Sequence, residues 1–342
     1  MDFAFTYEQD FLDRTARQLA SERFGPAVAR AALEGDHSAV DNSWKTLADT
    51  GWVGLRVPEE VGGSGAGLVE ASIVADALAC ALAPVPYVGT AFGATSVLGA
   101  VGGDAADALL AEIAGGRPFG VALSGNLEWP TTSPAIGWDC GADGAAVVVT
   151  SDGPQVVTCE VSETGADPLH PLSRVPDAIA AVVPERSQMA LAAMRIGCAA
   201  ALVGTLRGAS DLAFDYVKER RQYGQVIGSF QAVQHMCADV KVALESCHSA
   251  LYGAAWTVDN APADEAVKAA AVVKAWCAES VVAGVELVVQ LLGGIGVTWE
   301  SDAHLYLRQA HLYAGVLGSR RAVRFELGRS LLGKTEASHG SA

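Results

Sequence analysis

Long apolar stretches, broken by short polar and glycine-containing segments, divide this chain into predicted helices and strands. Between residues 188 and 218 the apolar side chains are so dense that several neighbouring elements must cover this helix, as in the core of a bundle. Helical patterns recur in four later segments, which are residues 233–258, 264–292, 301–308 and 319–332. The pattern therefore predicts a helical bundle in the carboxy-terminal half of the chain.

The amino-terminal part of the chain is also predicted to be helical. Thr6 and Gln9 have the spacing of a capping box at the start of a first helix, and the helical pattern continues to about residue 58. Pro58 and the glycines that follow it predict a loop. Three further helices are expected, over residues 70–83, 91–101 and 105–114.

Residues 77–103 contain no charged side chain, which raises the question of a membrane span. A spanning helix needs about 20 strongly apolar residues without helix-breaking positions. This stretch contains Pro84, Pro86, several glycines and many alanines. We interpret it as two buried helices joined by a proline-containing turn, and we expect no membrane association.

The pattern changes to short runs of Val, Ile and Ala between residues 119 and 183. Strands are expected over residues 145–150, 155–161 and 178–183, with a turn at the Ser-Asp-Gly-Pro segment between the first two. Together these patterns predict a mostly α protein with a small β domain. The expected divisions are an N-terminal helical domain (1–116), a reduced β domain (117–185), a C-terminal helical bundle (186–334) and a flexible tail (335–342).

Composition and charge reduce the number of ligand and partner classes that are expected for this protein. The chain has 342 residues, of which 51% are hydrophobic, and a net charge of -16, which argues against general binding of nucleic acid or anionic membranes. Seven scattered cysteines without a C-x-x-C pair favour reduced thiols, and no signal segment opens the sequence, so we expect a cytoplasmic protein. His235 and His248 lack a metal-ligand spacing, and no metal is expected.

Two segments of the predicted bundle combine arginine, glutamine and glycine. The first is ERRQYGQVIGSFQ, residues 219–231, and the second is QLLGGIG, residues 290–296, followed by LRQA at 307–310. Arginine suits two-pronged contacts with phosphate, but an arginine pair at a helix end also compensates the helix dipole. Similarly, a glycine pair can be an ordinary helix C-cap. On the residues alone these alternatives stay open.

Taken together, the two segments resemble hallmarks of the acyl-CoA dehydrogenase family. The resemblance implies an N-terminal helical domain, a middle β domain and a C-terminal four-helix bundle. It also implies FAD as the cofactor and an acyl-CoA substrate. In this family each active site takes pieces from two subunits, because one holds the flavin ring and the catalytic base while its neighbour holds the adenosine and pyrophosphate half of FAD.

The resemblance assigns cofactor contacts to particular residues. Those implied for the first segment lie near the pyrophosphate and adenine, those of the second lie along the pyrophosphate, and two later residues lie near the adenine. The implied FAD-binding residues are Arg220, Gln222, Tyr223, Gln231, Gln290, Gly293, Gly294, Ser319 and Arg321. Arg195 matches a position that often contacts CoA, although an ordinary surface or interface arginine is the alternative.

The part of the family pattern that holds the flavin ring and the base is missing. The flavin-ring loop has no counterpart at residues 121–126. The two positions where the family keeps its catalytic glutamate are occupied by Leu317 and Met194, neither of which accepts a proton. Glu326 lies about three helical turns beyond the first position. No catalytic residue is therefore assigned to this chain.

This asymmetry resembles the short, non-catalytic subunit of heteromeric (α2β2) acyl-CoA dehydrogenases of actinobacterial steroid side-chain catabolism. The expected function is to complete the FAD site of a homologous full-length partner, which would bind most of the acyl-CoA. Two alternatives remain, namely a homo-oligomeric enzyme of this fold with altered chemistry and a scaffold subunit without flavin.

Overall fold

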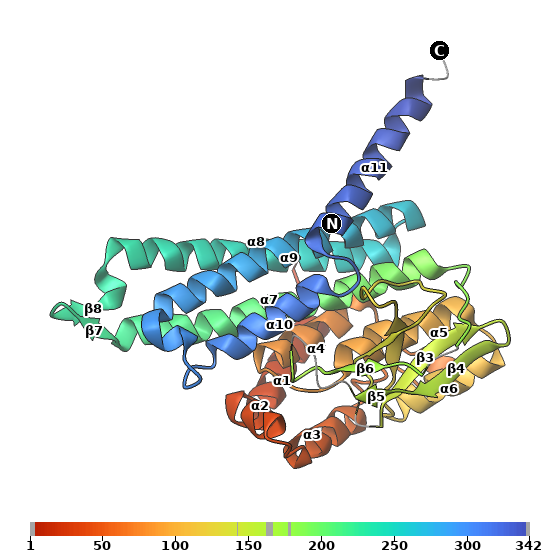
Figure 1. Cartoon of the computed structure of the whole chain (residues 1–342), viewed down its shortest axis with the longest axis horizontal. Coiled ribbons are helices and arrows are strands. Elements are labelled where there is room, and N and C mark those ends of the chain that lie inside the picture. The colour runs from red at the N-terminus through yellow and green to blue at the C-terminus, as the bar shows by residue number, and fades with distance from the viewer. Residues whose placement is uncertain (1–3, 142, 162–166, 177–178, 340–342) are drawn as a thin grey trace.

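Helix α7, Ser187–Glu219, runs through the centre of the fold and is covered by helices from both ends of the chain (Figure 1). The computed structural model describes residues 4–141, 143–161, 167–176 and 179–339. Glycines on α7 allow its neighbours to approach closely. A Cβ at Gly204 would lie 2.1 Å from the carbonyl oxygen of Asp76, and one at Gly208 would lie 2.3 Å from that of Cys80. Small residues on one face of α7 therefore set its packing against the amino-terminal helices.

Helices also form the amino-terminal layer. Its elements are α1 (Tyr7–Arg23), α2 (Pro26–Leu33), α3 (Ser38–Asp49), η1 (Glu59–Val61), α4 (Leu68–Cys80), η2 (Val88–Ala94), α5 (Thr95–Val101) and α6 (Asp104–Ala114). The predicted capping box at the start of α1 is confirmed, because the Thr6 hydroxyl accepts from the Gln9 N–H and the Gln9 side chain accepts from the Thr6 N–H. Helix α4 packs directly on α7.

The carboxy-terminal layer consists of long antiparallel helices. After α7 come a hairpin of β7 (Arg221–Gln222) and β8 (Gln225–Val226), η3 (Ile227–Ser229), α8 (Gln231–Asn260), α9 (Ala263–Leu292), η4 (Gly293–Val297), α10 (Ala303–Gly315) and α11 (Arg320–His339). Helices α7 to α10 form the bundle that the sequence predicts, and α11 projects away from the body (Figure 1).

The residues between the two groups of helices in the sequence form a six-stranded sheet. Its strands are β1 (Gly120–Leu123), β2 (Ile136–Trp138), β3 (Ala145–Thr150), β4 (Gly153–Thr158), β5 (Glu160–Val161) and β6 (Leu172–Arg174). Their order is β4-β3-β1-β2-β6-β5, and every pair is antiparallel except β1 with β3. The predicted class, mostly α with a small β domain, is therefore confirmed.

Several predicted boundaries differ from the observed ones. The helix expected over 91–101 is a π-helix, η2, followed by α5, and the hydroxyl of Thr95 donates to the carbonyl of Thr90 within it. The strand expected over 178–183 is reduced to one bridge between Ala181 and Thr150, and residue 178 lies outside the described residues. Helix α10 is longer than expected. Helix α11 continues to His339, into the segment expected to be a flexible tail.

Two helical segments have the length and composition of membrane spans. They are Ser187–Glu219 and Ala263–Val297, and 89% and 39% of their most apolar windows are buried inside the fold. A helix that is apolar on all sides occurs either in a protein core or in a membrane. The burial of α7 assigns it to the core. The more open segment contains α9, which exposes Val272 and Trp276 on its outer face.

Candidate functional site

The Arg-Gln-Tyr-Gly segment forms a tight hairpin at the far end of the bundle. Arg221 pairs with Val226 and Gln222 with Gln225, which leaves Tyr223 and Gly224 as a two-residue turn. Both turn residues have positive φ, 53° and 83°, as in the turn type that matches the twist of a hairpin. The Tyr223 side chain is 89% exposed. The local sequence therefore presents an aromatic ring to the solvent at the tip of the fold.

The second motif reaches the same end of the bundle. Helices α8 and α9 each have 30 residues and are joined by two residues, so the end of α9 returns beside the start of α8 (Figure 1). The side chain of Gln290 and the backbone of Gly293 and Gly294 are exposed there. Arg220, Gln222 and Gln231 are also exposed. We call this group of seven residues, which includes Tyr223, the bundle-end cluster.

Ser319 and Arg321 do not join the bundle-end cluster in this chain. They lie at the start of α11, after α10, whose 13 residues span about 20 Å. The Ser319 hydroxyl accepts a hydrogen bond from the N–H of Ala322, so it caps α11. The nine predicted FAD contacts thus occupy two separate surfaces, and all of them are exposed.

The two positions expected for a catalytic base are closed. The side chains of Met194 and Leu317 are 0% and 1% exposed. The N–H of Leu317 donates to the carbonyl of Leu127, at 2.8 Å. This bond joins the loop between α10 and α11 to the loop between β1 and β2. Leu317 and Leu127 both have positive φ, 62° and 61°. This backbone conformation costs a residue with a Cβ about 1–2 kcal/mol. Packing of the sheet domain against this loop holds both in place.

Arg195 is buried within the chain, and its guanidinium group is engaged in several hydrogen bonds. Its exposed fraction is 4%. The guanidinium donates to both carboxylate oxygens of Glu326, at 3.0 and 2.7 Å, and its Nε donates to the carbonyl of Leu317 at 3.3 Å. A two-pronged contact of this kind fixes the guanidinium firmly. Arg195 therefore holds α7, the Leu317 loop and α11 together.

A buried lysine supports the same loop from the other side. Lys274 of α9 is 0% exposed and donates to the carbonyls of Tyr313 and Ala314, at 2.8 and 2.9 Å. These carbonyls lie at the end of α10, where a cation is favoured by the helix dipole. Burial lowers the pKa of Lys274 to about 8. The amine thus anchors the chain just before Leu317.

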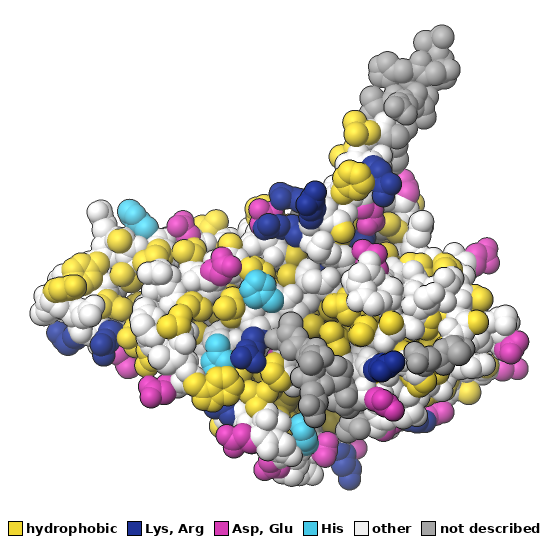
Figure 2. All heavy atoms as spheres, viewed as in Figure 1, with side chains coloured by type: hydrophobic (Ala, Val, Ile, Leu, Met, Phe, Trp, Pro, Cys, Tyr) yellow, Lys and Arg dark blue, Asp and Glu magenta, His cyan; other side chains and the backbone are white. Residues whose placement is uncertain are grey.

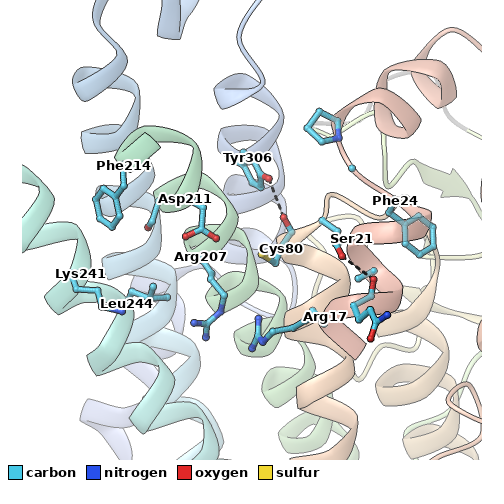
Figure 3. Close-up of a pocket in the computed structure, with 17 residues that line it drawn as sticks. Arg17, Ser21, Phe24, Cys80, Arg207, Asp211, Phe214, Lys241, Leu244 and Tyr306 are labelled. Atoms are coloured by element: carbon cyan, nitrogen blue, oxygen red, sulfur yellow. Dashed lines mark hydrogen bonds between the residues drawn. The ribbon is translucent and has the colours of Figure 1, made fainter. Parts of the chain in front are cut away.

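A groove of about 890 Å³ opens between α1, α4, α7, α8 and α10, away from both base positions (Figure 3). Arg17 and Arg207 line it, and both pair with the carboxylate of Asp76, whose side chain is 0% exposed. Arg207 donates to both oxygens of that carboxylate, at 3.2 and 3.0 Å. This cluster joins α1, α4 and α7, which is a structural role.

The bundle-end cluster has the chemistry that the dinucleotide half of FAD requires. Arg220 and its neighbour Arg221 supply exposed positive charge, and Figure 2 shows basic side chains at this end of the molecule. A Cβ at Gly294 would meet nothing within 4 Å, so this chain leaves open space over that backbone. The Leu317 region, in contrast, is filled by protein. The residues therefore fit the adenosine end of FAD better than its ring.

Some residues that shape the site carried little signal in the sequence. Lys274 could have been noticed, because it is the one charge in the apolar run 269–278 of a predicted helix. Glu326 gave no such signal, since its partner lies 131 positions away. The carbonyl of Leu127 belongs to a loop whose position depends on the sheet. Only tertiary packing brings these groups to the Leu317 loop.

Comparison with known proteins finds relatives for both helical parts of the chain. Residues 6–116 match the family described as acyl-CoA dehydrogenase, N-terminal domain, and residues 185–332 match acyl-CoA dehydrogenase, C-terminal domain. Acyl-CoA dehydrogenase IpdE2 of Mycobacterium tuberculosis is 32% identical over 336 residues, which cover 92% of this chain and 95% of that protein.

Acyl-CoA dehydrogenase FadE34 of Mycobacterium tuberculosis is 34% identical over 325 residues. The match covers 89% of this chain but 44% of FadE34, so the chain spans less than half of that relative. Among solved structures, a variant of the Tcur3481-Tcur3483 steroid ACAD has a TM-score of 0.82 and 26% identity, covering 96% of this chain and 99% of that one. The chain therefore belongs to the acyl-CoA dehydrogenase family.

Proposed function

We propose that this chain is the non-catalytic subunit of a heteromeric, FAD-dependent acyl-CoA dehydrogenase. The observation that carries the proposal is the closed base position, where Leu317 is 1% exposed and bonded through its N–H to Leu127. A carboxylate would be needed there to remove the α-proton of an acyl-CoA. Met194, at the other base position, is equally apolar and buried. The base would have to come from a homologous full-length partner.

The bundle-end cluster would hold the adenosine and pyrophosphate half of the partner's FAD. Arg220 would pair with the pyrophosphate, and Gln222, Gln231 and Gln290 would donate hydrogen bonds. The ring of Tyr223, 89% exposed, would cover the adenine. When bound, FAD supplies the hydride acceptor of the reaction. In this scheme the chain's own residues bind and orient the cofactor, and they exclude water from one side of it.

The remaining contacts that the resemblance implies involve Ser319, Arg321 and Arg195, which lie outside the bundle-end cluster. Ser319 and Arg321 lie at the start of α11 and would reach a cofactor only on a second surface of the chain. Arg195 is held by Glu326, so we propose no contact with CoA for it. The substrate class proposed is a bulky acyl-CoA, such as a steroid side-chain thioester, in line with the steroid ACAD that resembles this chain.

Purification of the chain alone, and together with a full-length homologue encoded nearby, tests the proposal. The expected result is a mixed assembly that carries flavin and oxidises acyl-CoA, and a lone chain that does neither. Arg220→Ala should lower the flavin content of the mixed assembly, while Arg23→Ala, an exposed arginine of α1, should leave it unchanged. Stoichiometric FAD and full turnover in the lone chain would refute the proposal. An unchanged flavin content after Arg220→Ala would favour a scaffold.

A further inference from the structure

A cavity of about 410 Å³ lies between the amino-terminal helices and the sheet domain, separate from the bundle-end cluster. One wall comes from α2 and α3. The opposite wall comes from the loops around β2 and before β6, and the connection between α4 and η2 closes one side. In Figure 1, α2 and α3 lie at the lower edge of the molecule, to the left of β5 and β6. The cavity has the volume of an ordinary small-molecule site.

The walls of the cavity are largely apolar, although His37, Asp41 and Ser173 also line it. Five prolines contribute to the lining, namely Pro84, Pro86, Pro118, Pro168 and Pro171. Proline has a fixed φ and no backbone N–H, so these five positions present carbon and carbonyl groups without a backbone donor. Trp44 adds an aromatic face, and its indole N–H donates to the carbonyl of Gly116 at 2.9 Å. The cavity is therefore formed before any ligand enters.

A buried carboxylate and imidazole lie at the base of the cavity. Asp139 and His170 are each 5% exposed, and both line the cavity. One oxygen of Asp139 accepts from the N–H of Gly89 at 2.7 Å, and the other lies 3.5 Å from Nδ1 of His170. A Cβ at Gly89 would lie 2.4 Å from the Cβ of Asp139, so only glycine allows this approach.

The imidazole of His170 is held in one orientation, and one of its two ring nitrogens makes no hydrogen bond with the described residues. Its ring packs edge-to-face against Tyr313, with ring centres 5.6 Å apart. Burial lowers the pKa of His170, but the hydrogen bond to Asp139 and the charge of Asp167 outweigh this, so its pKa is raised. The bond to Asp139 uses Nδ1, and the described residues make no other hydrogen bond with the ring. His170 borders both this cavity and a small void beside Tyr313, and Nε2 is the ring atom left to meet a ligand, as a donor when the ring is charged and as an acceptor when it is neutral.

From this geometry we infer a second binding site, for an uncharged and mostly apolar molecule that carries one hydroxyl or carbonyl group. The apolar body would lie against the prolines and Trp44. A hydroxyl satisfies Nε2 of His170 in either protonation state, because it both donates and accepts. A carboxylate or phosphate is disfavoured, since two carboxylates, Asp139 and Asp41, line the cavity and the described residues around it include histidines but no Lys or Arg. The site is independent of the FAD contacts proposed above.

Fluorescence titration of the full chain with 1-hydroxypyrene and with pyrene tests this inference. Both probes are flat and apolar, and they differ only in the hydroxyl group. Ala32 of α2 lines the cavity, so Ala32→Phe would fill it, and Val40→Phe of α3 provides a second filling variant. Ala81→Phe is the matched control, because Ala81 lines the groove of Figure 3 instead. His170→Phe removes the imidazole at the base and leaves Asp139 in place.

The expected result is saturable binding with one probe per chain and tighter binding of 1-hydroxypyrene than of pyrene. The difference should be about fivefold, the equivalent of one hydrogen bond of about 1 kcal/mol. Each filling variant should weaken binding at least about tenfold, the equivalent of about 1.4 kcal/mol, and Ala81→Phe should not. His170→Phe should remove the preference for the hydroxyl.

Any of three results would overturn the inference. The first is unchanged affinity in a folded filling variant, and the second is equal loss of affinity in Ala81→Phe. Absence of saturable binding to the wild-type chain would overturn it as well. If His170→Phe fails to fold, the wild-type preference for 1-hydroxypyrene over pyrene decides the role of the polar base. The flavin content of the assembly should be the same in wild type and Ala32→Phe, which separates this site from the cofactor contacts.

Discussion

Replacing Glu326 with alanine tests whether Arg195 is a structural anchor or a residue free to contact a ligand. The Arg195 side chain is 5% exposed and that of Glu326 is 45% exposed. Removing the partner of a fully buried charge costs about 3–5 kcal/mol, and removing an exposed ion pair costs about 0–1 kcal/mol. Arg195 would retain the carbonyl of Leu317. We therefore expect Glu326→Ala to lower the free energy of unfolding by about 2 kcal/mol.

Urea unfolding of the purified chain measures this change, with Glu279→Ala as the matched control. Glu279 pairs with Arg324 at 2.9 Å, but both side chains are more than a third exposed. Its removal should cost less than about 1 kcal/mol and should become undetectable in about 0.5 M salt, because salt screens exposed pairs. The Glu326→Ala effect should persist in salt. Equal effects of the two substitutions would show that Arg195 is not held in this way.

Three further predictions test the packing and the cofactor contacts. Gly204→Ala should destabilise the fold by about 1–3 kcal/mol in urea unfolding, because the new Cβ would lie 2.1 Å from the Asp76 carbonyl, whereas Gly253→Ala, in open space on α8, should not. Gly294→Ala should leave stability nearly unchanged but lower the flavin content of the mixed assembly, and equal flavin content would argue against the proposed contact. Lys274→Met should remove a rise in the free energy of unfolding between pH 8 and 10.5, because burial lowers the pKa of Lys274 from 10.5 to about 8.

The sign of the lysine effect follows from proton binding. Lys274 has a pKa of about 8 in the folded chain and 10.5 as its ordinary value. Between these pH values the unfolded chain binds more protons, so this group makes stability rise with pH. The shift corresponds to about 3 kcal/mol. Burial raises the pKa of several cysteines and tyrosines in the folded chain, and these groups ionise within the same pH range once the chain unfolds, so the measurement is the difference between wild type and Lys274→Met. A difference that does not change from pH 8 to 10.5 would contradict the assignment.

The sequence allowed the helical framework to be predicted, because long helices carry their own periodic signal. The helix expected over 188–218 is Ser187–Glu219, and that expected over 264–292 is Ala263–Leu292. Strands β1 and β2 were not predicted individually. They have four and three residues, and their positions depend on pairing with each other and with β3 and β6. Elements this short lack a period that could be recognised.

The candidate site was only partly predictable for a related reason. Gln222-Tyr223-Gly224 stood out in the sequence as part of a motif, but the hairpin that these residues form was not predicted. The environment of Arg195 could not be predicted, because its partner Glu326 lies on another helix and 131 residues further along the chain. Likewise, the capping of α11 by the Ser319 hydroxyl was not predicted, and the cofactor contact implied for Ser319 stays a prediction. Residues whose roles depend on distant partners require the structure.

The division of cofactor binding between two chains is tested most directly by counting flavins. The chain should be purified alone and with its full-length homologue, and the FAD bound per chain measured from the visible absorption spectrum after denaturation. We expect no bound flavin in the lone chain and fewer flavins than chains in the mixed assembly. One tightly bound FAD per chain in the lone protein, with acyl-CoA oxidation, would contradict a division of cofactor binding between two chains.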